Sequence, residues 1–284
     1  MIQDMFSRNS SLSFEVFPPK KDDEFDNCFR ILDELAALGP DFISVTYGAG
    51  GSRSKKTVEI ANYIQNKLKL DAMAHMTCVG STKSEILGVT EELEAVGVHH
   101  VLALRGDKPR DMSDEQFERR IFPHAADLIQ FINKNTQLQI SASCYPEKHP
   151  EAISMDSDIA FMKMKQDMGA RMFISQLFFD NADMYRFIER CDKAGITVPI
   201  VAGIMPITTA RQIGTTVSLS GSSIPKRLAD ICANYGEDPD SMRKAGIEYA
   251  VDQINDLRRA GIGHIHIYCM NKPKTTAEIC SLLH

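Results

Sequence analysis

The feature that most constrains the fold is a repeated alternation of short apolar segments with longer stretches of helical spacing. Each apolar segment is rich in Val, Ile or Phe, and a glycine commonly stands shortly before the next one. Strands separated by helices pair in parallel through right-handed crossovers, and eight such units predict a closed (β/α)8 TIM barrel of the α/β class. The predicted strands are residues 12–17, 42–46, 72–77, 100–104, 138–143, 172–176, 200–203 and 264–268.

The stretches between these strands carry helix signals of their own. Phe25, Cys28, Phe29, Leu32, Leu35 and Ala36 fall on one face of a helix that should end at Gly39-Pro40. Thr82 and Glu85 have the spacing of a capping box. Residues 218–235 predict an extra loop and helix before a long last helix at 240–260, with a terminal helix at 275–283. Because no linker divides the chain, we expect a single barrel domain over residues 1–284.

Composition excludes several classes of function. The 284 residues are 43% hydrophobic and 25% charged, with a formal net charge of -6, so the broad basic surface of a nucleic-acid binder is not expected. The sequence has no apolar run long enough for a membrane span, and its start does not resemble a secretory signal. Seven scattered cysteines without a C-x-x-C pair favour a reducing, cytoplasmic location over structural zinc or disulfides.

Polar side chains collect where the predicted strands end. In barrels of this kind the active site lies at the C-terminal ends of the strands, so these residues are the first candidates for a site. They are Glu15, Thr46, Tyr47, His75, Thr77, Arg105, Gly106, Asp107, Tyr145, His149, Gln176, Tyr268, Asn271 and Lys272.

Glu15 is the most informative of these candidates. It shares a strand face with Ser13 and Phe17, while Phe14 and Val16 point to the other face. A strand of a parallel barrel has no free solvent face, and a carboxyl group there is costly unless it is paired or uncharged. A structural salt bridge is the alternative, but burial favours a catalytic acid with a raised pKa.

Other motifs carry weaker signals. Arg105-Gly106-Asp107 favours a ligand-binding turn, with a structural ion pair as the alternative, because glycine allows close approach of the backbone. Gly48-Ala49-Gly50-Gly51 lacks the pattern of a dinucleotide fingerprint or a P-loop, and it is typical of a turn.

A metal-dependent barrel hydrolase is an alternative reading. His264 and His266 lie two apart on one strand face and, together with His75, offer three imidazoles. No carboxylate lies on the same segment as the pair, which favours a structural role for both histidines. We therefore expect no metal.

Seven segments, in order, resemble the methylenetetrahydrofolate reductase family, in its bacterial form that consists of the catalytic domain only. Any one motif would be weak, but the ordered set is specific and extends from about residue 11 to residue 283. The segments are Ser13-Phe14-Glu15-Val16-Phe17-Pro18-Pro19, Ser44-Val45-Thr46-Tyr47-Gly48-Ala49, His75-Met76-Thr77-Cys78, Ala103-Leu104-Arg105-Gly106-Asp107, Tyr145-Pro146-Glu147-Lys148-His149-Pro150-Glu151-Ala152, Gln176-Leu177-Phe178-Phe179-Asp180 and Gly203-Ile204-Met205-Pro206-Ile207.

The resemblance implies an FAD-dependent enzyme that reduces 5,10-methylenetetrahydrofolate to 5-methyltetrahydrofolate with NAD(P)H, by a ping-pong mechanism. By position, Glu15 is similar to the general acid of the family and Asp107 to a carboxylate beside the flavin. Gln176, Gln212, Lys272 and Asp107 match substrate-binding positions. The flavin-contacting positions are matched by Thr46, Tyr47, Ala49, His75, Arg105, Gly106, Asp107, Ala125, Tyr145, His149, Ala152, Asp158 and Lys165.

The chain also departs from the family pattern. Phe161 and Met164 stand where familiar bacterial members have polar or basic residues facing the phosphate and adenosine end of the flavin. Lys272 replaces a familiar Arg, and Thr216 lies near a family aromatic that stacks on the substrate. Family members commonly form homo-oligomers, and some work with partner proteins. A flavoprotein subunit that transfers electrons within a folate-methyl complex is therefore the second reading.

Overall fold

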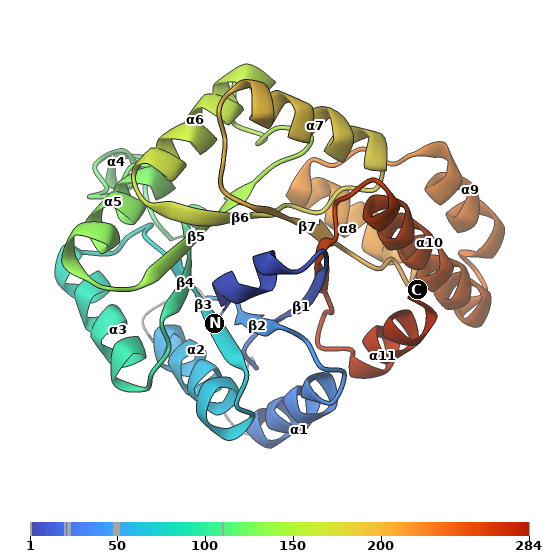
Figure 1. Ribbon diagram of the computed structural model, residues 1–284, viewed down its shortest axis with the longest axis horizontal. Coiled ribbons are helices and arrows are strands. Elements are labelled where there is room, and N and C mark those ends of the chain that lie inside the picture. The colour runs from blue at the N-terminus through green and yellow to red at the C-terminus, as the bar shows by residue number, and fades with distance from the viewer. Residues whose placement is uncertain (1, 20, 22–23, 48–51, 110, 284) are drawn as a thin grey trace.

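Eight parallel strands close into a barrel in the computed structural model, which describes residues 2–19, 21, 24–47, 52–109 and 111–283 (Figure 1). The barrel closes where the first strand pairs with the last, from Ser11 opposite His264 to Glu15 opposite Tyr268. All eight predicted strands are present, with their ends displaced by two residues at most. The strands are β1 (Ser11–Val16), β2 (Phe42–Val45), β3 (Asp71–Thr77), β4 (His100–Leu104), β5 (Gln139–Cys144), β6 (Ala170–Ser175), β7 (Ile200–Ile204) and β8 (His264–Tyr268).

Helices surround the barrel and bury the outward-facing residues of the strands, which alternate with inward-facing ones. On β1, for example, the buried Phe14 and Val16 pack toward the helices, as predicted from the alternation. The main helices are α1 (Phe25–Ala36), α2 (Ser52–Asn62), α3 (Lys83–Ala95), α5 (Ala125–Asn135), α6 (Met155–Asp167), α7 (Asn181–Lys193), α8 (Ala210–Ser220), α9 (Lys226–Tyr235), α10 (Pro239–Arg259) and α11 (Pro273–Leu282).

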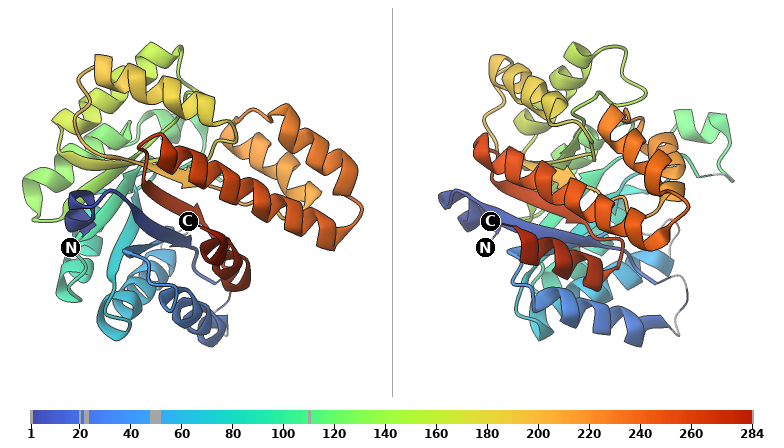
Figure 2. Two further views of the ribbon diagram at one scale, coloured as in Figure 1. Left: turned by 45° about the vertical axis from the view of Figure 1, so that its right-hand side comes forward. Right: turned by 90° about the vertical axis from the view of Figure 1, so that its right-hand side faces the viewer.

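Local signals explain where the helices begin and end. Thr82 accepts a hydrogen bond from the backbone N–H of Glu85, whose carboxylate accepts one in return, so the predicted capping box of α3 is confirmed. Gly39, after α1, has a φ of 67°, a left-handed conformation that glycine adopts at low cost. The extra helix before the last unit is also confirmed as α9, which lies beside α10 at one side of the barrel (Figure 2).

Three short elements were not anticipated from the sequence. They are the 3-10 helix η1 (Ile2–Ser7), the π-helical turn η3 (Tyr63–Lys67) and the short helix α4 (Asp114–Glu118). Figure 2 shows η1 and α4 at opposite ends of the molecule. Each is too short for a clear periodic pattern, so hydrophobic spacing could not reveal it.

The barrel interior consists of two chemically different layers. The layer near η1 is apolar, and Ile2 and Met5 of η1 pack into it beside strand residues Phe42, Met73, Leu102, Met172, Ile174 and Val201. Above it, toward the C-terminal ends of the strands, lie the polar side chains of Ser13, Ser44, Glu15, His75 and His266. The floor of the barrel is therefore packed with hydrocarbon, and its mouth carries the polar chemistry. In the part of the chain that is described, no helix is long and apolar enough to cross a membrane.

Candidate active site

A cavity of about 1440 Å³ opens at the C-terminal ends of the strands. It exceeds the roughly 300–1,000 Å³ of most small-ligand pockets, so one small ligand would leave much of it empty. Most of the residues predicted to form a site lie along its wall. These are Glu15, Thr46, Tyr47, His75, Arg105, Gly106, Asp107, Ala125, Tyr145, His149, Ala152, Asp158, Lys165 and Gln176.

Three predicted residues are placed differently. Ala49 lies outside the described residues. Gln212 and Lys272 are not among the residues that line the cavity. The side-chain oxygen of Gln212 accepts hydrogen bonds from the backbone N–H groups of Thr208 and Thr209 at 2.9 Å, and Lys272 Nζ donates to Thr208 Oγ1 at 3.5 Å. In this structure the two residues form a hydrogen-bonded group that caps α8, and their contact with a substrate stays a prediction.

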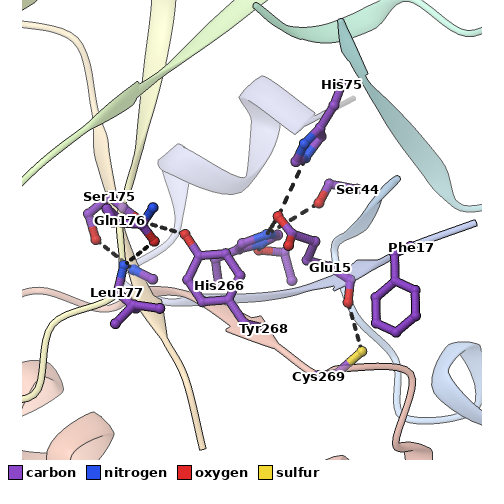
Figure 3. Close-up of polar contacts among 12 residues, drawn as sticks. Glu15, Phe17, Ser44, His75, Ser175, Gln176, Leu177, His266, Tyr268 and Cys269 are labelled. Carbon is purple, nitrogen blue, oxygen red and sulfur yellow. Dashed lines mark hydrogen bonds and ion pairs between the residues drawn. The ribbon is translucent and has the colours of Figure 1, made fainter. Parts of the chain in front are cut away.

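Glu15 lies between two buried histidines at the floor of the cavity (Figure 3). Its Oε2 is 3.5 Å from His75 Nε2 and 4.0 Å from His266 Nε2. The 22% of its side-chain surface that remains exposed belongs to the cavity wall. Burial raises the pKa of Glu15 to about 8 and lowers the pKa of each histidine to about 3. At neutral pH all three groups are therefore uncharged, and the predicted raised pKa of Glu15 is found.

Serine hydroxyl groups contact both ring nitrogens of His266. Its Nδ1 lies 2.7 Å from Ser13 Oγ, and its Nε2 lies 3.3 Å from Ser44 Oγ. Ser13 Oγ also lies 3.2 Å from the carbonyl oxygen of Ile265.

His75 directs a ring nitrogen toward the same carboxyl group. Its Nε2 is buried and has no hydrogen-bond partner in the described part of the protein. Two imidazole nitrogens thus face the side of Glu15 that carries Oε2. Desolvation in these buried surroundings disfavours the charged carboxylate and keeps the proton on Glu15.

Gln176 offers one defined hydrogen-bonding group to the cavity. Its Oε1 accepts a hydrogen bond from the backbone N–H of Leu177 at 2.9 Å, which leaves the Nε2 amino group as a donor for a ligand. The backbone just before Gln176 is held by Tyr268, whose hydroxyl donates to the Ser175 carbonyl at 2.6 Å (Figure 3). Gly203 makes room for this contact, because a Cβ there would lie 2.3 Å from the Ser175 oxygen and 2.7 Å from the Tyr268 ring.

The cavity wall also carries two basic side chains, Arg105 and Lys165. Arg105 donates to both carboxylate oxygens of Glu151, with Nη2–Oε1 at 2.8 Å. Lys165 Nζ donates to the Ser143 carbonyl at 2.9 Å, and burial lowers the pKa of this ammonium group. Gly106 has a φ of 84°, and a Cβ there would meet the Val79 side chain at 2.8 Å, so packing within the protein requires glycine at this position. The Arg of this turn is ion-paired, as the structural alternative anticipated, and a ligand-binding role of the turn stays a prediction.

The rim beyond Lys165 is partly apolar. Phe161 lines the cavity with 40% of its surface exposed, and its ring lies 5.7 Å from that of His124. Met164, one turn further along α6, is 43% exposed. Thr216 also belongs to the lining. The departures from the family pattern at positions 161 and 216 therefore fall on the cavity itself.

Two of the three histidines considered for a metal site, His264 and His266, contact serine hydroxyl groups instead. His264 Nδ1 lies 2.9 Å from Ser11 Oγ at the η1 end, and its ring packs edge-on against Phe6. Among the described residues, no group of three or more His, Cys, Asp and Glu side chains is arranged to hold a metal ion.

Sequence reasoning missed the apolar part of the cavity wall. The residues concerned alternate with outward-facing positions on the strands or follow directly after them, so a barrel register would have been needed to find them. They include Leu102, Leu104, Ile174, Leu177, Met205 and Met270.

Comparison with known proteins assigns the barrel to a family. A family model described as methylenetetrahydrofolate reductase matches residues 1–284. The chain belongs to the methylenetetrahydrofolate reductase family. The 5,10-methylenetetrahydrofolate reductases of Pectobacterium carotovorum subsp. carotovorum and Escherichia coli (strain K12) are each 32% identical to it over 273 residues, which cover 96% of this chain and 90% of the relative.

A plant member of the family is similarly related, and a solved structure has the same barrel fold. Methylenetetrahydrofolate reductase (NADH) 1 of Zea mays is 33% identical over 281 residues, which cover 95% of this chain and 47% of the plant protein. A Clostridium thermocellum protein, described as binding two copies of 5-methyl-5,6,7,8-tetrahydrofolic acid, superposes with a TM-score of 0.69 at 14% identity, covering 99% of this chain and 96% of that one. At that identity the likeness concerns the barrel fold alone.

Proposed function

We propose that the protein reduces 5,10-methylenetetrahydrofolate to 5-methyltetrahydrofolate, with FAD as cofactor, NAD(P)H as reductant and Glu15 as proton donor. The observation that carries the proposal is the uncharged Glu15, held 3.5 Å from His75 and facing a cavity large enough for more than one ligand. Family membership and the names of the bacterial relatives support the same reaction.

The chemistry of the substrate explains why a protonated carboxyl is needed. The carbon to be reduced bridges two nitrogens and accepts hydride poorly while its ring is closed. Protonation of N-10 opens this ring and leaves a cationic iminium on N-5, which accepts hydride readily. A glutamic acid with a pKa of about 8 still holds its proton at neutral pH, whereas an ordinary glutamate has lost it.

The chain has residues that fit FAD. Arg105 and Lys165 place cationic groups on the wall, as a diphosphate requires, and Gly106 adds a lining position without a side chain. His75 also lines the cavity, where its ring would contact the cofactor. When bound, FAD would supply the hydride carrier between NAD(P)H and the folate. Phe161 would meet the adenosine end with an aromatic face in place of hydrogen-bond donors.

Two further side chains have distinct tasks in this proposal. Asp107 lies on the exposed rim of the cavity, where an ionised carboxylate would stabilise the cationic iminium electrostatically. Gln176 directs its amino group into the cavity and would donate to an acceptor on the folate or on the nicotinamide. Because the same side of the cavity would bind NAD(P)H and the folate in turn, the kinetics should be ping-pong.

Substitution of Glu15 tests the proposal directly. In the Glu15→Gln variant, FAD binding and reduction by NADH should persist, while reduction of methylenetetrahydrofolate should be lost. The matched control is Glu91→Gln on the exposed face of α3. Folate reduction by Glu15→Gln at the control rate would overturn the proton-donor role. A purified protein that is colourless and takes up no added FAD would overturn the flavin assignment.

A further inference from the structure

The chain leaves β8 through an unusual backbone conformation. Met270 and Asn271 have φ values of 51° and 53°, a left-handed pair at positions without glycine. Asparagine tolerates this region better than most residues, but methionine does not. The turn closes with the backbone N–H of Lys272 donating to the Cys269 carbonyl at 2.9 Å. Two consecutive left-handed residues of this kind indicate that contacts outside the turn hold its backbone in place.

The turn directs the Asn271 side chain to the end of β1. Asn271 Oδ1 accepts a hydrogen bond from the Phe17 backbone N–H at 3.1 Å, and Asn271 Nδ2 donates to the Phe17 carbonyl at 2.9 Å. The amide thus satisfies both backbone groups of one residue, as a neighbouring strand would. The regular pairing of β1 with β8 has already ended, two residues earlier, at Glu15 opposite Tyr268.

The same turn also contacts Glu15. Cys269 Sγ donates to the Glu15 carbonyl oxygen at 2.8 Å (Figure 3). Together with the Asn271 bonds to Phe17, this contact holds both Glu15 and Phe17 to the segment that follows β8. On the other side of β1, the Thr46 N–H donates to the Val16 carbonyl at 2.9 Å. Without Asn271, Phe17 would lose its bonds to the β8 side, two residues from the residue that holds the proton.

We propose that Asn271 is a positioning residue for Glu15: its amide extends the β1–β8 pairing by a residue and keeps the Glu15 carboxyl at its depth between His75 and His266. This inference rests on the proposed role of Glu15 as proton donor. Loss of the amide frees the end of β1, lets water reach the carboxyl and reduces the desolvation that keeps it protonated.

The test compares Asn271→Gly with Lys69→Gly. Glycine at position 271 accepts the left-handed backbone and removes only the amide, so the turn itself is preserved. Lys69, with a φ of 57° in the turn before β3, is the matched control for relief of the same backbone strain far from the cavity. In each protein without added cofactor, the carboxyl stretch of Glu15 is titrated by infrared difference spectroscopy against the same protein carrying Glu15→Gln.

The expected midpoint is about 8 in Lys69→Gly, as in the parent protein, and at least about one pH unit lower in Asn271→Gly. In the FAD-loaded enzyme, the folate half-reaction of Asn271→Gly should slow by about tenfold or more, because small displacements of a reacting group are costly. The rate of flavin reduction by NADH should change by less than about twofold, because the Glu15 carboxyl takes no part in that half-reaction.

An unchanged infrared midpoint overturns the inference, and so does an equal loss in both half-reactions with a lowered melting temperature, which would indicate a general structural role. The infrared titration is independent of catalysis. If Glu15→Gln reduced folate at the normal rate, the proton-donor role would fail, yet a shifted midpoint in Asn271→Gly would still show that Asn271 positions Glu15.

Discussion

The uncharged state of Glu15 has a measurable consequence for stability, and the Glu15→Gln variant isolates it. The folded protein holds the pKa of Glu15 at about 8, whereas the unfolded chain has the ordinary value of 4.5. Between these values the folded state binds one proton that the unfolded state has released. The stability contributed by this proton is fully present below pH 4.5 and is lost as the pH rises through 8.

The magnitude follows from the width of that pH window. One pKa unit corresponds to about 1.4 kcal/mol, so the free energy of unfolding of the parent protein should fall by about 4 kcal/mol from pH 5 to pH 8 on account of Glu15 alone. Glutamine has a similar shape and does not titrate. The difference in unfolding free energy between Glu15→Gln and the parent should therefore shift by this amount, in favour of the variant, as the pH rises.

Urea unfolding followed by circular dichroism at pH 5, 6, 7 and 8 measures this difference. Only the pH dependence of this difference tests the prediction, because any packing cost of the substitution is the same at every pH. Glu91→Gln is again the control, since the Glu91 side chain is exposed on α3. Parallel curves for Glu15→Gln and the parent protein would refute the reasoning, because they would mean that Glu15 titrates alike in the folded and unfolded chains.

Three further predictions follow from the same geometry. Asp107→Asn should retain FAD and its reduction by NADH but slow the folate half-reaction by roughly 10–100-fold; stopped-flow rates equal to those of the parent would contradict its electrostatic role. Gly203→Ala should destabilise the fold by about 1–3 kcal/mol, because its Cβ would meet the Ser175 carbonyl at 2.3 Å, and urea titration measures the loss. His266 has a folded pKa of about 3, below its ordinary 6.5, so its contribution is present above pH 6.5 and lost as the pH falls through 3. His266→Gln should therefore show a shallower loss of stability on acidification, and an identical acid slope would count against the buried neutral ring.

Much of the fold could be predicted because the signals were local. Val- and Ile-rich runs, Gly39 at a left-handed helix end and the Thr82 capping box each reflect conformations set within a few residues. The strand count and the position of Glu15 on an inward face followed from alternation. The elements that were missed depend on tertiary contact, as with η1, whose six residues are stabilised by Ile2 and Met5 in the barrel floor.

The polar residues of the site could be predicted from the sequence, but most of their contacts with one another could not. A strand-end position indicated that Glu15 and His75 belong near a site, but nothing local indicated that His75 and His266 would both direct Nε2 toward Glu15. That relation depends on the register of β1, β3 and β8 around a closed barrel. In the same way, the Gln212 amide serves as a helix cap, a role that its motif match did not anticipate.

The orientation of Gln176 also sets a rule for molecules designed to block the cavity. A free glutamine amide accepts a donor or an acceptor by rotating, but the Leu177 N–H already occupies its oxygen. A compound that places a carbonyl or ring nitrogen opposite Gln176 gains a hydrogen bond. An analogue with an N–H group there leaves two donors facing each other, at a cost of about 1–3 kcal/mol, or roughly ten- to a hundredfold in affinity. Inhibitor selectivity at this position should thus depend on the polarity of a single atom.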